Sequence, residues 1–268
     1  MNTSCLIETI KFSIDPDFIV NSDNSMPPTT TNPDLMKYIW SKTEEITSEK
    51  RKGTLFYVMR HGETPSNVEK KIIGCEVDED LTNKGIEDAI KIAKKIGALQ
   101  ENGKIHLGSI YSSPLVRAAK TANIVAQELK LGLEMREDLK EINWGNASKF
   151  TDEERTSKWG EEEKQLINKY PDLTDLWNHL PAIPNAEKYN SLLERTIKEI
   201  QKISRENQQK EIALVCHGRL IRTLTAKCLN TEDRKKVPYA GNCDIAVFHY
   251  SEEVDGSSPC LSFLGIAE

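Results

Sequence analysis

The chain has 268 residues, of which 38% are hydrophobic and 29% charged, and its mean hydropathy is -0.53. This length suits one large domain or two small ones, and no apolar run is long enough to cross a bilayer. A formal net charge of -6 and a pI of about 5.6 argue against a general nucleic-acid binder. A binding site for an anion must therefore be formed by positive side chains gathered locally, because the chain as a whole is negatively charged.

The cysteines and the first twenty residues indicate in which cellular compartment the protein is expected. The six cysteines show no CxxC pair and no regular spacing, which is typical of reduced thiols rather than of a zinc site or a disulfide framework. The first twenty residues lack a signal-peptide core, because Glu8 and Lys11 interrupt it. We expect a cytoplasmic protein without membrane contact, and a bacterial protein exported by a non-classical signal would look the same.

Residues 1–52 differ from the rest of the chain. They hold four of the eleven prolines and the run NSDNSMPPTTTNP, which is typical of a linker. A short helix is predicted after this run, with Asn32 as N-cap and Pro33 at the first helical position. We expect residues 1–52 to be an extension packed on a main domain of residues 53–268.

From residue 54 onward, apolar runs typical of strands alternate with apolar stripes at helical spacing. In chain order, we expect a strand at 54–59, a helix at 84–99, a strand at 108–113, a helix at 114–129, a weaker strand at 133–139, an acidic insertion of short helices at 152–180, a helix at 188–204, a strand at 211–216, a helix at 220–229 and a last strand at 244–250. This alternation predicts an α/β fold, a three-layer sandwich with a mostly parallel central sheet flanked by helices, plus a helical insertion.

Polar residues follow three of these strands. Arg60 and His61 end the first strand, Arg117 lies in the first turn of the helix after the second, and His217 follows the strand at 211–216. Ligands of open α/β sheets bind outside the carboxyl ends of the strands, where helix N-termini also point. Guanidinium groups suit a phosphoryl group. The pattern therefore predicts a site for a phosphoryl anion.

Each of these residues has a plainer explanation when it is taken alone. His61 could be a hydrogen-bonded turn histidine, and Arg117 a solvated helix residue. His61 and His217 could also ligate a metal, but no HExxH-type spacing accompanies them and the adjacent arginines would repel a cation. The conjunction at three strand ends favours the anion site.

Five segments, in order, carry a family resemblance. They are RHGETPSN from residue 60, LTNKG (81–85), SSPLVRAAKTA (112–122), AEKYNSLLERT (186–196) and CHGRLIRTL (216–224). Together they resemble the motifs of the histidine phosphatase superfamily, phosphoglycerate mutase-like branch (branch 1), over roughly residues 54–250. The resemblance implies a phosphohistidine enzyme with no cofactor and no metal.

The resemblance also implies roles for particular residues. His61 would be the nucleophile that accepts the phosphoryl group, with its attacking nitrogen unprotonated. Residues around it would bind the phosphoryl oxygens and supply the positive charge that phosphoryl transfer needs. These phosphate-binding residues would be Arg60, Asn67, Arg117, His217 and Gly218.

The proton for the leaving oxygen would come from Glu141, in the stretch EINWG, which fits the family's E-x-x-x-G pattern. Without the resemblance Glu141 would be one surface carboxylate among 42 acidic residues. The chain departs from the pattern at Ser148 and Lys149, at Asp88 and at Arg219. Lys149 and Arg219 could add positive charge to a substrate pocket, or could simply be solvated.

The acidic insertion helps to distinguish a phosphatase from a mutase. Residues 151–175 hold eight acidic and four basic side chains, and no arginine pair occurs between 156 and 190, where glycolytic mutases place arginines for the substrate carboxylate. Pro65-Ser66 also stands where mutases commonly place a tryptophan. We therefore expect a metal-independent phosphatase that hydrolyses a phosphomonoester, with phosphoglycerate mutase as the alternative.

Two further alternatives concern the wider function. A non-catalytic member that only binds a phospho-ligand is disfavoured, because all the catalytic positions that we can match are filled. A companion sugar-phosphate kinase domain is excluded, because no GxxxxGK[ST] loop is present. The expected partner is a small phosphorylated metabolite or a phosphoprotein, with no nucleic acid.

Overall fold

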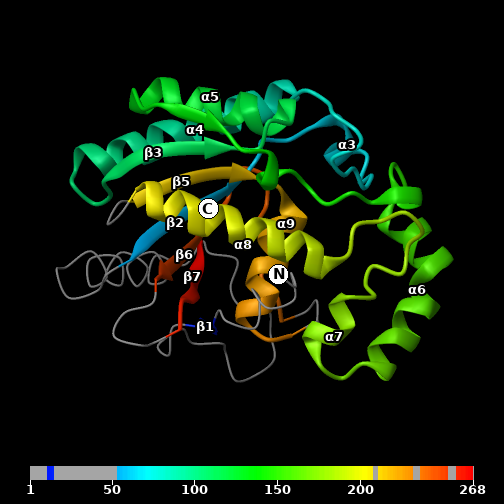
Figure 1. Cartoon of the computed structure of the whole chain (residues 1–268). Helices are drawn as coiled ribbons and strands as arrows, with labels where there is room; N and C mark the ends of the chain where they lie inside the picture. Colours follow the sequence, from blue (N-terminus) through cyan, green and yellow to red (C-terminus); the bar gives the residue numbers. More distant parts are fainter. Residues whose placement is uncertain (1–10, 15–52, 208–210, 232–235, 253–257, 268) are drawn as a thin grey trace.

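A central sheet organises the computed structural model of the chain, which describes residues 11–14, 53–207, 211–231, 236–252 and 258–267 (Figure 1). The sheet has seven strands in the order β1-β7-β6-β2-β5-β3-β4. Their bounds are β1 (Lys11–Ile14), β2 (Thr54–Arg60), β3 (Leu107–Ser112), β4 (Leu133–Met135), β5 (Glu211–Cys216), β6 (Ile245–Ser251) and β7 (Cys260–Ala267). β6 runs antiparallel to both of its neighbours, and the other paired strands are parallel. The prediction of a mostly parallel sheet is confirmed.

Helices cover both faces of this sheet. The described helices are α3 (Pro65–Val68), α4 (Asn83–Glu101), α5 (Val116–Leu129), α6 (Asp152–Lys169), α7 (Leu173–Trp177), α8 (Tyr189–Glu206) and α9 (Gly218–Cys228), with short 3₁₀ turns η1 (Glu137–Leu139) and η2 (Gly145–Ala147). α4 and α5 pack on one face and α8 and α9 on the other (Figure 1). The three-layer α/β sandwich is therefore confirmed.

The central strand β2 shows why the sequence folds this way. All seven of its residues are buried. Phe56 and Val58 belong to the apolar cluster under α8 and α9, whereas Leu55, Tyr57 and Met59 belong to the cluster under α4 and α5. Because side chains alternate along a strand, a continuous apolar run is what a strand covered on both faces requires.

The acidic insertion differs from the expectation of short helices. Its main element is α6, a single helix of 18 residues. Thr151 and Glu154 form a capping box at its start, acidic residues fill its first turn, and Lys169 lies in its last turn. Pro171 comes only after the helix has ended, so it does not break it. The capping box and the charges at the two ends therefore favour one long helix here, despite the polar composition of the segment.

Two strand predictions were incomplete. The weak strand expected at 133–139 is paired only over Leu133–Met135, after which the chain turns into η1. The strand at 244–250 is not the last, because β7 follows and pairs antiparallel with β6. The stretch that forms β7, CLSFLGIA, includes serine and glycine, which are weak strand formers.

Only part of the N-terminal extension is described. β1 pairs parallel with β7, in the register Lys11↔Cys260. The helix expected to begin at Asn32–Pro33 lies outside the described residues, and the division at residue 52 stays a prediction. None of the helices within the described ranges combines the length and apolarity that crossing a membrane requires.

Candidate active site

The sheet register brings the predicted strand ends together. Arg60, the last residue of β2, lies opposite Cys216, the last residue of β5, and Ser112 at the end of β3 lies opposite Val215. The next residues continue this alignment, since the backbone N–H of His61 donates to the carbonyl of Cys216 at 3.0 Å. The carboxyl ends of three parallel strands therefore meet at one point, as the sequence pattern predicted.

His61 has a defined protonation state. It is buried, and its Nδ1 lies 2.7 Å from the carbonyl oxygen of Gly62. A carbonyl oxygen only accepts hydrogen bonds, so Nδ1 carries the proton and Nε2 keeps its lone pair. Burial lowers the pKa of His61 well below its usual value, and the charges of Arg60 and Arg117 lower this pKa further. His61 is therefore a neutral imidazole with a lone pair on Nε2.

His217 lies beside it at the N-cap position of α9. The two imidazole ring centres are 5.3 Å apart. The Nε2 of His217 lies 2.8 Å from the hydroxyl oxygen of Ser113, and among the described residues its buried Nδ1 has no hydrogen-bond partner. Burial, and then the charge of Arg117, lower the pKa of His217 well below its usual value. His217 is thus a second neutral imidazole with a ring nitrogen that a ligand could engage.

Arg60 is held at the end of β2. Its Nη1 donates to the hydroxyl of Tyr239 and, at 3.0 Å, to the carbonyl of Ala240. Its buried Nε has no hydrogen-bond partner among the described residues. A Cβ at Gly218 would lie 3.1 Å from this Nε, so glycine allows the guanidinium to approach the start of α9 closely.

Arg117 is buried in the first turn of α5, with 1% of its surface exposed. Its Nη2 donates to the carbonyl of Gly74 and its Nη1 to that of Val77, each at 3.1 Å. It also forms an ion pair with Asp78 at 3.5 Å. Arg117 is therefore a buried cation fixed by the segment at 74–78, not the solvated helix residue of the plainer explanation.

Glu141 lies across from these cations and is also buried. Its Oε1 accepts a hydrogen bond from the backbone N–H of Ile142 at 2.9 Å. Its Oε2 accepts one from the backbone N–H of Arg219 at 3.0 Å. Two backbone donors therefore hold this carboxylate in one orientation, which excludes the alternative of a surface charge.

A cavity of about 140 Å³ connects these groups. Of the residues that the sequence predicted for the site, it is lined by Arg60, His61, Asn67, Glu141 and Gly218. Arg117 and His217 are buried and do not line it, but Arg117 is close enough to lower the pKa of both histidines. The structure thus brings all seven predicted residues into one neighbourhood. Within the described ranges, no three histidine, cysteine or carboxylate side chains gather as a metal site would need.

The model of the family described as histidine phosphatase superfamily (branch 1) matches residues 56–255. The chain belongs to this superfamily.

Relatives of this chain carry both phosphatase and mutase names. "Probable phosphoglycerate mutase GpmB" of Escherichia coli is 30% identical over an alignment that covers 74% of this chain and 86% of that protein. A metal-independent phosphoserine phosphatase of Arabidopsis thaliana is 25% identical, with 81% of this chain and 84% of the relative covered. A crystal structure of a mutant phosphoserine phosphatase from Entamoeba histolytica in complex with phosphoserine matches with a TM-score of 0.61 at 28% identity, covering 79% of this chain and 97% of that one. The comparisons support phosphatase activity at a general level.

Asn67 is held at the site by a residue that sequence reasoning missed. The Oδ1 of Asn67 accepts a hydrogen bond from the side-chain amide of Asn242 at 2.9 Å. The same amide nitrogen donates to the backbone carbonyl of His61 at 3.0 Å. Asn242 therefore ties Asn67 to the strand end that carries His61.

Tyr239 and Asn242 were missed because they precede β6 in the stretch PYAGNC, which has the composition of an ordinary loop. Pairing of β6 with β2 brings this loop beside Arg60, and the backbone N–H of Cys243 donates to the Arg60 carbonyl at 3.1 Å. No local signal in the sequence marks such a long-range contact. Ser113, by contrast, lies inside the SSPLVRAAKTA segment and could have been found.

The residues that depart from the family pattern lie in different places in the structure. Arg219 lines the cavity, with its guanidinium carbon 5.0 Å from the centre of the Trp144 ring. Lys149 is exposed and is not part of the cavity lining, and Asp88 pairs with Lys84 on the surface of α4. Of the two cations suggested for a substrate pocket, the structure therefore supports Arg219.

Proposed function

We propose that this chain is a metal-independent phosphatase that hydrolyses a phosphomonoester through a phosphohistidine formed on His61. The observation that carries the proposal is the hydrogen bond from His61 Nδ1 to the Gly62 carbonyl, which leaves a lone pair on Nε2 at the cavity. A lowered pKa keeps this imidazole neutral, as a nucleophile must be.

In the first step, Nε2 of His61 attacks phosphorus and the ester oxygen leaves with its electron pair. Arg60 and Arg117 offset the charge on the phosphoryl oxygens, His217 contributes a hydrogen bond from its ring, and the backbone N–H of Gly218 at the start of α9 assists. Glu141, in its protonated form, gives its proton to the leaving oxygen. Asn67 helps to bind the phosphate.

In the second step, water attacks the phosphohistidine. Glu141, now a carboxylate, takes a proton from the water, and the phosphorus–nitrogen bond breaks with its electron pair returning to Nε2. Inorganic phosphate leaves and His61 is restored. The same carboxyl group thus acts once as an acid and once as a base, and its two backbone donors hold it in one orientation.

A small phosphorylated metabolite is the preferred substrate, with a phosphoprotein as the other option. The size of the cavity at the site, about 140 Å³, supports a small molecule. We also propose a reducing compartment such as the cytoplasm, since the five cysteines among the described residues are all free thiols.

The test is hydrolysis of p-nitrophenyl phosphate without added metal, compared between the wild type and His61→Ala. We expect turnover by the wild type and a loss of at least about 10³-fold in the variant, as for removal of a nucleophile. Rapid acid-free quenching with labelled substrate should trap a protein-bound label that is acid-labile and base-stable. Equal turnover by the two proteins would sink the phosphohistidine mechanism.

Phosphoglycerate mutase is the second candidate, and the 30% identity to the Escherichia coli relative favours it. A mutase would interconvert 2- and 3-phosphoglycerate faster than it releases phosphate, and 2,3-bisphosphoglycerate would stimulate it. Phosphate release that exceeds interconversion would instead support the phosphatase.

A further inference from the structure

The segment at 186–196 contains an ion pair that the proposed mechanism does not use. Glu187 precedes α8, and Arg195 lies in the second turn of this helix. The Nε and Nη2 of Arg195 donate to the two carboxylate oxygens of Glu187 at 2.8 and 3.0 Å. The two side chains are only 20% and 16% exposed, so the pair is largely shielded from water. A contact through two parallel hydrogen bonds fixes the plane of the guanidinium.

The other N–H groups of Arg195 hold the backbone of the loop that carries Glu141. Nη1 donates to the carbonyl oxygens of Asp138 and Lys140, at 2.7 and 2.8 Å. Nη2 donates to the carbonyl oxygen of Glu141 itself at 3.1 Å. Together with the bonds to Glu187, all five N–H groups of the guanidinium therefore have an acceptor. A lysine could not reproduce this pattern, because its ammonium lacks the planar fork.

Glu187 holds the same loop two residues after Glu141. Its Oε2 accepts a hydrogen bond from the backbone N–H of Asn143 at 3.3 Å, and its own backbone N–H donates to the Asn143 carbonyl at 2.9 Å. Residues 140–144, between η1 and η2, are neither helix nor strand. Their backbone groups therefore depend on partners outside regular secondary structure. The ion pair supplies such partners on both sides of Glu141.

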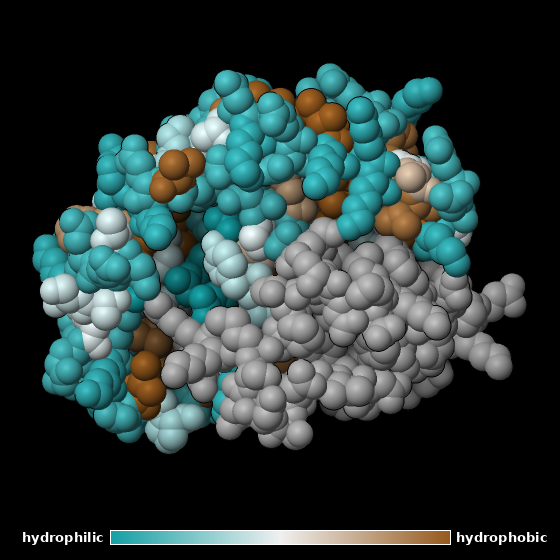
Figure 2. Space-filling view, turned by 180° about the vertical axis from the view of Figure 1, so that it is seen from behind, coloured by the Kyte–Doolittle hydropathy of each residue, from teal (hydrophilic) through white to brown (hydrophobic). Residues whose placement is uncertain are grey.

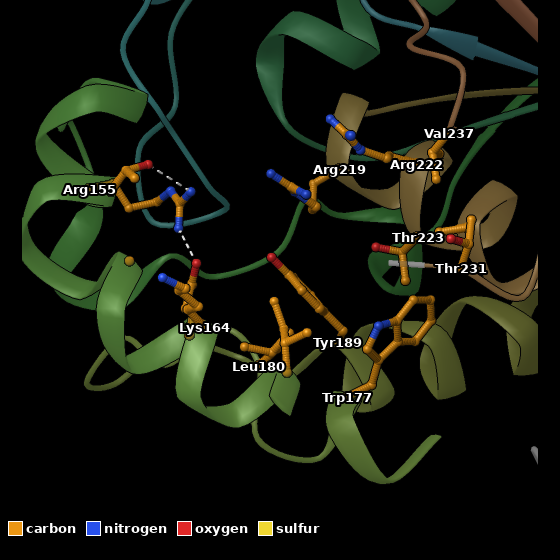
Figure 3. Close-up of a pocket in the computed structure, with 15 residues that line it drawn as sticks. Arg155, Lys164, Trp177, Leu180, Tyr189, Arg219, Arg222, Thr223, Thr231 and Val237 are labelled. Atoms are coloured by element: carbon orange, nitrogen blue, oxygen red, sulfur yellow. Dashed lines mark hydrogen bonds and ion pairs between the residues drawn. The ribbon is translucent and has the colours of Figure 1, made fainter. Parts of the chain in front are cut away.

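The carboxylate of Glu141 is held by a different helix, α9, through the backbone N–H of Arg219. The guanidinium of Arg219 lies over the rings of Trp144 and Tyr189, 5.0 and 5.6 Å from their centres. Trp144 belongs to the loop of Glu141, and Tyr189 is the first residue of α8. Figure 3 shows Arg219 and Tyr189 facing the same cavity, which measures about 350 Å³. The backbone of Glu141 is thus held from α8 and its carboxylate from α9.

Arg195 and Glu187 line neither this cavity nor the one at His61. Seen from behind, the surface is hollowed between the lobe formed by α6 and α7 and the rest of the molecule, and the floor of the hollow is hydrophilic (Figure 2). Glu141 lines the cavity at His61, whereas Arg195 contacts the backbone of its loop. A substrate bound at His61 would therefore meet Glu141 and not Arg195.

We propose that the Arg195–Glu187 ion pair positions Glu141 for proton transfer to the leaving oxygen. The proposal rests on the proposed function, in which Glu141 is the acid. Without the pair, the carboxylate would keep its bond to α9 while the backbone beneath it loses three hydrogen bonds from Arg195. Because a proton donor must lie within hydrogen-bond reach of its acceptor, a displacement of about 1 Å slows the transfer strongly.

Arg195→Met tests the proposal with two substrates whose leaving groups differ. The alkoxide of glycerol 3-phosphate needs a proton, and p-nitrophenolate does not. We expect kcat/KM for glycerol 3-phosphate to fall by about 10- to 100-fold, and that for p-nitrophenyl phosphate to change by less than about 3-fold. The inhibition constant of inorganic phosphate should stay at its wild-type value. An equal loss for both substrates would show a general structural role and would overturn the proposal.

Arg195→Lys separates position from charge. Burial and other charges lower the pKa of His217 most, and the charge of Arg195 lowers this pKa further. The lysine variant keeps that charge but cannot form the fork, so it should lose activity as Arg195→Met does. Wild-type constants in Arg195→Lys would assign the effect to charge and contradict positioning. The matched control is Arg205→Met, which removes an ion pair with Glu252 at 2.9 Å from the same helix and should behave as the wild type.

A double-mutant cycle links Arg195 to Glu141. In the Glu141→Gln background, Arg195→Met should cause no further loss with glycerol 3-phosphate, because the residue that it positions no longer transfers a proton. A further loss as large as that in the wild-type background would show that Arg195 acts elsewhere, and the proposal would then be wrong. Melting curves show whether each variant is folded.

Hydrogen exchange distinguishes failure of this proposal from failure of the proposed function. The backbone N–H of Arg219 lies in the first turn of α9, where helical N–H groups have no partner within the helix, and it donates to Glu141. If p-nitrophenyl phosphate is not hydrolysed through His61, exchange at this N–H still reports the position of Glu141. It should be faster in Arg195→Met, as in Glu141→Ala. Wild-type exchange in Arg195→Met beside fast exchange in Glu141→Ala would overturn the proposal whatever the activity.

Discussion

The carboxylate of Glu141 accepts a hydrogen bond from the backbone N–H of Arg219 at 3.0 Å, across 78 positions of the chain. Arg219 is the second residue of α9, the helix that His217 caps. One helix start therefore holds the proposed acid, contributes to the proposed phosphate site and carries a cation of the cavity at His61. The proposed phosphate binding and proton transfer therefore both depend on the start of α9.

Glu141→Gln should separate the two steps. With glycerol 3-phosphate, whose alkoxide leaving group needs a proton, we expect kcat to fall by about 10²- to 10³-fold. With p-nitrophenyl phosphate the leaving group needs no proton, so the phosphohistidine should form and then persist for lack of a base. Rapid quench should show a burst of one equivalent of p-nitrophenol.

The matched control is Glu101→Gln, at the exposed end of α4, which should behave as the wild type. A loss of the same size for both substrates, without a burst, would contradict a role of Glu141 as acid and base.

Tyr239→Phe should weaken phosphate binding through Arg60. The substitution removes the hydroxyl that accepts a hydrogen bond from Arg60 Nη1 and keeps the ring, whose centre lies 5.1 Å from the guanidinium carbon. Because Tyr239 is half exposed, we expect a modest effect, a rise in KM for p-nitrophenyl phosphate of roughly 3- to 10-fold, with a smaller change in kcat. The inhibition constant of inorganic phosphate should rise in parallel. Tyr170→Phe, at the ring that stacks on His179, is the control, and unchanged constants in Tyr239→Phe would contradict the role.

The two site histidines should stay neutral well below pH 6.5. Burial lowers the pKa of each, and the nearby arginines lower it further. In ¹⁵N NMR spectra of labelled imidazoles, assigned with His61→Gln and His217→Gln, both signals should keep the neutral pattern from pH 8 to about 5.5. Titration of either signal at or above pH 6.5 would show that the site is more solvated than the structure indicates.

The same lowered pKa values predict a loss of stability in mild acid. Below about pH 6.5 the unfolded chain binds protons at these two histidines and the folded chain does not, so the free energy of unfolding should fall as pH falls. Each histidine contributes a slope of up to about 1.4 kcal/mol per pH unit. Urea denaturation at several pH values should show a shallower slope for His217→Gln than for the wild type. An unchanged slope would exclude His217 as a source of this pH dependence.

Local sequence patterns determined most of the fold. Strands β2 and β5 are apolar runs buried on both faces, and α4, α5 and α8 carry apolar stripes at helical spacing. Short stretches of sequence are therefore enough to predict whether an element is buried on one face or on both. α6 shows the opposite case, since its polar composition led to a prediction of short helices, whereas the capping box at Thr151 and Glu154 begins one helix of 18 residues. β7 was missed because its identity as a strand depends on pairing with β6.

The sequence by itself also determined which residues meet, since Arg60, His61 and His217 follow parallel strands, whose carboxyl ends share one edge. Only the tertiary structure decided the protonated nitrogen of His61, the contacts of Tyr239 and Asn242, and which charges of α6 face a cavity. Counting acidic residues in the insertion favoured a phosphatase over a mutase, but the count could not say which of them face a cavity: Glu163 lines one beside α9, whereas Asp152 and Glu153 are exposed and line none. The physical reason is that a count along the chain ignores direction, whereas packing selects the face of a helix that a ligand meets.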